Sequence, residues 1–313
     1  MALPLRTAPN DVDGSTDRIE TEIGNYITDF AAREVLITEW DQLRRSRIPV
    51  RYFTPIATGI LMVAPLEILQ DLLQSCKKAP DVFFDGVMTR LNKDSLTAIQ
   101  SYVIGDRMDT IPWTDKENTA TCILDGSSRR VDTLRLFPLI YNGQHEIHRL
   151  QSILEAFWGE KAASWIATFT NPDLVESPQN HISLGWTSQS LFFNARIAFK
   201  PLRSVDPNER RLQLHLLKPS AFRNFNSYFY DNPLHHAGLD AENTKTWGDG
   251  CADWRGWLSF KTGHIVTIRA ENPADLPDWD MLELQWDLHR VAAIAGAKMS
   301  SVYDGDGLGW CAR

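Results

Sequence analysis

The spacing of apolar residues changes along this chain, and that change constrains the fold more than any other feature. In residues 17–47 and 66–76, apolar side chains recur three and four positions apart, as on one face of a helix. In residues 212–216 and 264–269, apolar and polar side chains alternate, as in a half-buried strand. After Pro277 the helical spacing returns and predicts a closing helix. Separate helical and strand segments together predict an α+β fold.

Four segments are expected along the sequence. Residues 1–17 are polar and contain proline and glycine, which predicts a flexible arm. Residues 18–105 are predicted to form a helical N-terminal part, in which Pro55 interrupts the helical pattern. Residues 106–300 should form a mixed core that ends in strands and the closing helix, and residues 301–313 a flexible tail.

The composition argues against several classes of function. A formal net charge of −8 disfavours duplex-DNA binding, since lysine and arginine contacts with phosphate supply most of that affinity. The four cysteines are scattered without a C-x-x-C pair, and phosphate-binding and dinucleotide-binding loops are absent from the sequence. We therefore expect no metal, no organic cofactor and no nucleic-acid partner. The longest apolar run, Ile56–Val63, is too short to span a bilayer, and we expect a cytoplasmic protein.

Three polar residues in the middle of the chain lie among recognisable motifs. Arg135 precedes the run Leu-Phe-Pro, Asn180 opens the stretch NHISLGWTSQSLFFNARIAFKP, and Gln189 lies nine residues after Asn180. Residues 276–292 read LPDWDMLELQWDLHRVA, and an earlier turn reads CILDG. These motifs resemble the fungal HNH-nuclease family, which has a ββα-metal fold, and the resemblance covers residues 115–297. In that family, histidines stand where this chain has Arg135 and Gln189.

The resemblance implies a degenerate ββα-metal-like centre without nuclease chemistry. The first histidine of the family activates water, and the second helps to hold a divalent metal ion. Arg135 cannot act as a base because a guanidinium stays protonated near neutral pH. Gln189 is neutral and a poor substitute for an imidazole ligand. Asn180 keeps the residue that orients the loop in the family.

Our leading hypothesis is therefore a metal- and cofactor-independent cyclase or isomerase of fungal natural-product biosynthesis, for example a pericyclase that directs a [4+2] cycloaddition. Arg135 and Gln189 would donate hydrogen bonds to a carbonyl and stabilise its developing negative charge. Asn180 and His181 are further candidate catalytic residues. A small apolar substrate of terpenoid or polyketide type would contact four aromatic side chains: Phe137, Trp186, Phe192 and Phe193.

Several alternatives stay open from the sequence. The chain is alternatively a non-catalytic pseudonuclease that binds protein or nucleic acid, or a residual metal-dependent HNH endonuclease that uses other histidines. A purely structural role is also open: Arg135 pairs with Asp132 or another carboxylate, Gln189 caps a neighbouring group, and the aromatic side chains belong to the core. His181 is either a relocated acid–base group or an imidazole with satisfied hydrogen bonds.

Overall fold

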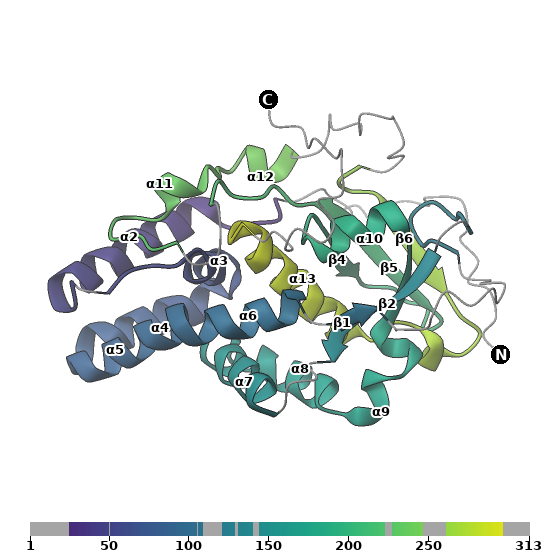
Figure 1. The fold of residues 1–313 in the computed structure, drawn as a ribbon, viewed down its shortest axis with the longest axis horizontal. Helices are drawn as coiled ribbons and strands as arrows, with labels where there is room; N and C mark the ends of the chain where they lie inside the picture. Colours follow the sequence, from purple (N-terminus) through teal and green to yellow (C-terminus); the bar gives the residue numbers. More distant parts are fainter. Residues whose placement is uncertain are drawn as a thin grey trace.

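The described part of the chain combines helices with two small antiparallel sheets (Figure 1), which confirms the α+β class. The computed structural model describes residues 25–49, 51–104, 106–108, 121–128, 131–139, 144–222, 227–246 and 261–296. The predicted arm at 1–17 and the predicted tail at 301–313 lie outside the described residues.

Helices make up the N-terminal part, as predicted. They are α2 (Phe30–Arg47), α3 (Pro55–Val63), α4 (Leu66–Lys78), α5 (Asp81–Thr89), the π-helix η1 (Arg90–Asp94) and α6 (Ser95–Ile104). Pro55 begins a helix where the sequence predicted an interruption, because proline fits the first helical turn and the Thr54 hydroxyl accepts a hydrogen bond from Ala57 N. Every residue of α3 is buried, so no amphipathic pattern marks this helix in the sequence.

No single helix among the described residues is long and apolar enough to span a membrane. By length and composition, the pair α3 and α4, bent by 118°, passes that test when taken together.

The first sheet has the order β1-β2-β3. Its strands are β1 (Asp106–Met108), β2 (Val131–Leu139) and β3 (His181–Gly185), and helix α10 (Trp186–Phe193) follows β3 directly. Between β2 and β3 the chain forms α7 (Gln144–Trp158), α8 (Lys161–Phe169), α9 (Pro172–Val175) and η2 (Pro178–Asn180). Helices α7 and α8 are separate because Gly159 adopts a left-handed conformation with φ 58°, which ends α7.

The second sheet has the order β4-β5-β6. Its strands are β4 (Ile197–Leu202), β5 (Glu209–Leu216) and β6 (Ile265–Arg269); the short helices α11 (Leu234–Ala237) and α12 (Asn243–Thr246) lie between β5 and β6, and η3 (Pro273–Asp275) precedes the closing helix α13 (Trp279–Ile294). The alternating patterns predicted at 212–216 and 264–269 are therefore strands, and the closing helix is present.

Helix α13 joins the two predicted parts of the molecule. In Figure 1 it runs through the middle, between the N-terminal helices and the strands, and it contacts α3, α8, β2 and β4. Its first turn is capped by the Asp278 carboxylate, which accepts hydrogen bonds from Asp280 N and Met281 N. The contact with α3 is close because Gly59 lacks a side chain: a Cβ there would lie 2.6 Å from the Val291 carbonyl oxygen.

Candidate functional site

Asn180 braces the junction between strands β2 and β3. Strand β2 pairs antiparallel with β3, with Arg135 opposite His181, and α10 follows. The Asn180 side chain is fully buried, accepts a hydrogen bond from Phe137 N at 2.8 Å and donates one to Phe137 O at 2.9 Å. Both amide functions are thus used to fix the chain before β3 onto the end of β2. Asn180 therefore has a structural role in the described fold.

Arg135 forms an ion pair within the protein. Its side chain is buried, and its Nη2 atom lies 3.0 Å from Glu176 Oε2, while the Glu176 side chain is 58% exposed. The neighbouring His181 donates from Nδ1 to the Ser177 carbonyl oxygen at 2.6 Å. Arg135 and His181 thus both interact with other groups of the protein, which agrees with the purely structural role left open by the sequence.

Gln189 is held on another face of β2. Its Nε2 atom donates to Asp132 Oδ2 at 3.0 Å and to the Leu184 carbonyl oxygen at 2.7 Å. Successive side chains of a strand point to opposite faces, so Asp132 and Arg135 lie on different sides of β2. Arg135 and Gln189 therefore do not converge on one ligand, contrary to the predicted pair of donors.

The predicted aromatic pocket is mostly core. Phe137 stacks on Phe169 with ring centroids 4.7 Å apart, and Phe192 is fully buried with its ring 4.4 Å from that of His289. Phe193 is half-buried against the same core. Trp186 differs, since 57% of it is exposed. The four aromatic residues therefore do not line one cavity, because three of them fill the space between the sheets and α13.

The motif positions do not fit a divalent metal ion. Arg135 brings a positive charge to the place where the resemblance puts a histidine, and both amide hydrogens of Gln189 point at acceptors. Within the described ranges no group of three His, Cys, Asp or Glu side chains is arranged to hold a metal. The positive charge of Arg135 therefore opposes the binding of such an ion at these positions.

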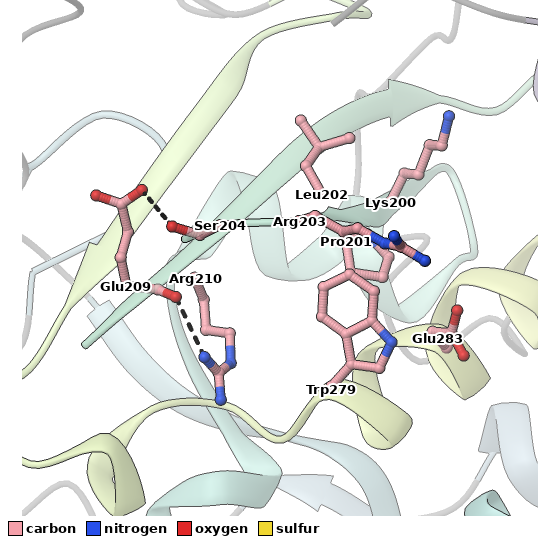
Figure 2. Close-up of a pocket in the computed structure, with 9 residues that line it drawn as sticks. All are labelled: Lys200, Pro201, Leu202, Arg203, Ser204, Glu209, Arg210, Trp279 and Glu283. Carbon is pink, nitrogen blue, oxygen red and sulfur yellow. Dashed lines mark hydrogen bonds between the residues drawn. The ribbon is translucent and has the colours of Figure 1, made fainter. Parts of the chain in front are cut away.

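A cleft lies elsewhere, between the end of β4, the start of β5 and the first turns of α13 (Figure 2). Its volume is about 600 Å³, within the size range of small-molecule sites. The residues that line it are Lys200, Pro201, Leu202, Arg203, Ser204, Glu209, Arg210, Trp279 and Glu283. We call this cavity the β4–α13 cleft. Sequence reasoning missed it, because Lys200 and Pro201 entered only as letters of a family motif.

A second cavity of about 310 Å³ adjoins the β4–α13 cleft and shares Lys200, Pro201 and Glu283 with it. At its inner end the buried Asp287 carboxylate pairs with Arg290 and accepts a hydrogen bond from Trp158 Nε1 at 2.8 Å. Charged side chains from three elements thus line this cavity: Lys161 from α8, Lys200 from β4, and Glu283 and Asp287 from α13.

His215 also lines the second cavity. Its Nε2 atom donates to Gln213 Oε1 at 2.9 Å, and its ring centroid lies 4.8 Å from that of Trp286. Burial, with smaller effects from the charges of Lys200 and Arg290, lowers the pKa of His215 to about 3. The imidazole is therefore neutral at physiological pH and cannot supply a proton there.

Comparison with protein-family models, with curated proteins and with solved structures finds no match to this chain. What the protein does must therefore be inferred from its own residues.

Proposed function

We propose that this protein is a pseudonuclease, a ββα-nuclease-like framework that acts by binding a partner and does not hydrolyse phosphodiesters. The observation that carries the proposal is the pairing of Arg135 with Glu176 and of Gln189 with Asp132. Both positions at which the resemblance puts histidines make internal contacts, while Asn180 keeps its bracing role. On this proposal the motif serves as a structural element, and the side chains of Arg135, Asn180 and Gln189 stabilise it.

Elementary chemistry supports the loss of hydrolysis. A general base must accept a proton from water, and a guanidinium cannot do so near neutral pH. The same positive charge repels a divalent cation from the position beside Arg135. A net charge of −8 also weakens any attraction to a polynucleotide, so a protein or small-molecule partner fits better than nucleic acid.

A plasmid-nicking assay tests this proposal. The full chain is incubated with supercoiled plasmid and with single-stranded DNA in Mg²⁺ or Mn²⁺, with and without EDTA, and we expect no cleavage above that of a mock preparation. The matched variants are Gln189→Ala in the motif and Arg149→Ala on the exposed surface of α7. Cleavage above the mock preparation that EDTA abolishes would contradict the proposal, and its loss in Gln189→Ala but not in Arg149→Ala would place that activity at the motif.

The cofactor-independent cyclase or isomerase is a second candidate, and the two adjoining cavities favour it. Together they offer a site large enough for a natural-product intermediate. The hydrogen-bond donors would then come from Lys161 and Lys200, with Arg135 as a structural residue. Their charges favour a substrate with an anionic group over the wholly apolar substrate expected from the sequence.

Turnover of candidate intermediates, followed by mass spectrometry, tests this second candidate. We expect Lys200→Ala to slow turnover at least tenfold, and Lys245→Ala on exposed α12 to leave it unchanged. Equal turnover rates in the two variants would show that Lys200 in the cleft takes no part in the reaction.

A further inference from the structure

The cationic groups of the β4–α13 cleft are not balanced by its carboxylates. Lys200, Arg203 and Arg210 line the cavity together with Glu209 and Glu283. Each carboxylate has a cationic partner that lies outside this cavity. A local excess of positive charge therefore remains in a chain whose net charge is −8.

Glu209 is held at the edge of the sheet. Its Oε2 atom lies 2.9 Å from Arg269 Nη2 on β6, and its Oε1 atom accepts a hydrogen bond from the Ser204 hydroxyl at 3.1 Å. Glu283 lies 3.6 Å from Lys161 Nζ and accepts a hydrogen bond from Trp165 Nε1 at 3.4 Å. Both carboxylates thus interact with groups on neighbouring elements.

The guanidinium groups, in contrast, keep hydrogen-bond donors available. Arg203 is exposed and makes no hydrogen bond or ion pair with any residue that the structure describes. Arg210 is oriented by its Nε atom, which donates to the Pro277 carbonyl oxygen at 3.1 Å, and by Nη1, which donates to the Glu209 carbonyl oxygen at 3.2 Å. Its Nη2 atom has no hydrogen-bond partner among the described residues. Charge-assisted bonds from guanidinium groups are the stronger kind and suit carboxylate or phosphate.

Trp279 supplies a flat surface in the same cleft. In Figure 2 its indole lies in the centre of the lining residues, and the side chain is partly exposed. Trp279 begins α13, but Asp278 already accepts hydrogen bonds from the amides of that first turn. The helix end is therefore not available to an anion, and any anion must be held by the side chains. A partly exposed indole beside cations favours a ligand with an aromatic ring.

We infer that the β4–α13 cleft binds a small ligand in which a flat aromatic ring carries a carboxylate or phosphate group. The ring packs on Trp279, and the anionic group is bound by Arg203 and Arg210, with Lys200 adding positive charge. This inference concerns binding alone and holds whether or not the protein turns the ligand over. It is also independent of the pseudonuclease proposal, because it does not use the contacts of Arg135, Asn180 or Gln189 on which that proposal rests.

Isothermal titration of the full chain with four probes tests the inference. The probes are naphthalene-2-carboxylate, 2-naphthyl phosphate, the neutral naphthalene-2-carboxamide and inorganic phosphate. We expect the two aromatic anions to bind at least tenfold more tightly than the carboxamide and than inorganic phosphate, and their affinity to fall as salt rises. The stronger of the two aromatic anions identifies which anionic group the cleft prefers.

Matched variants locate the binding. Arg203→Ser and Trp279→Leu should each weaken the aromatic anions at least fivefold, whereas Arg149→Ser on α7 and Trp186→Leu on α10, which are both exposed, should not. If Trp279→Leu fails to fold, as judged by circular dichroism, the exposed Arg203→Ser variant decides. The inference would be overturned if neither aromatic anion binds, or if the carboxamide binds as tightly as they do. It would also be overturned if the control variants weaken binding as much as Arg203→Ser and Trp279→Leu.

Discussion

The buried neutral imidazole of His215 predicts that the stability of this protein falls at mildly acidic pH. Only 2% of the residue is exposed, and burial, with smaller effects from Lys200 and Arg290, lowers its pKa to about 3. In the unfolded chain the same side chain has a pKa of about 6.5. The two states therefore bind different numbers of protons between these values, and stability must depend on pH there.

The sign and size of the effect follow from this difference. Below about pH 6.5 the unfolded chain takes up a proton that the folded protein excludes, so the free energy of unfolding falls as the pH drops. Above that value His215 contributes no pH dependence. Each pH unit costs about 1.4 kcal/mol, which amounts to about 2 kcal/mol at pH 5. Burial also lowers the pKa of His264, which adds a loss in the same direction and requires a variant of His215 as the comparison.

Urea unfolding followed by tryptophan fluorescence measures the effect. The free energy of unfolding is determined at pH 7.5 and pH 5.0 for the parent, for His215→Gln and for His148→Gln, an exposed histidine on α7. We expect the parent and His148→Gln to lose about 2 kcal/mol more than His215→Gln between the two pH values. The substitution itself can change stability at both pH values without affecting this difference. The same pH dependence in His215→Gln and in the parent would refute the reasoning.

Three further predictions concern packing and buried polar groups, and chemical denaturation measures each. Gly59→Ala should destabilise by about 1–3 kcal/mol or more because its Cβ would lie 2.6 Å from a backbone oxygen of α13. Gly86→Ala, on a helix position with nothing within 4 Å, should stabilise by about 0.5–1 kcal/mol, and equal effects of the two changes would contradict the close contact. Asn180→Ala should cost about 3 kcal/mol because two buried backbone groups of β2 lose their partner, and a loss below about 1 kcal/mol would refute the bracing role. Asp287→Ala should cost about 3–5 kcal/mol because it leaves the buried Arg290 charge without its carboxylate, and Asp287→Ala with Arg290→Met should recover part of that loss.

The sequence by itself determined those elements in which apolar residues recur at a regular spacing. Apolar residues recur three and four positions apart along α13 and alternate with polar residues in β5 and β6, so local spacing was enough to predict these elements. Their burial was not predicted, since the structure buries most of α13 and both faces of β5. The sequence did not predict α3, because a helix that is buried on all sides has no polar face to set a period. Local spacing also does not mark the end of α7, because apolar residues continue at helical spacing across Gly159, whose left-handed backbone ends the helix.

Which polar groups meet was decided only by the tertiary structure. The sequence singled out Arg135 as a side chain that cannot act as a base and Gln189 as a poor metal ligand, but their partners, Glu176 and Asp132, are 41 and 57 residues away along the chain. The β4–α13 cleft is assembled from residues near 200–210 and from the start of α13 at Trp279. Local spacing reports which side of an element is buried, whereas a binding site depends on which elements are brought together. That information resides in the packing of distant segments, so the sequence drew attention to Arg135 and Gln189, and the fold decided where a ligand has room to bind.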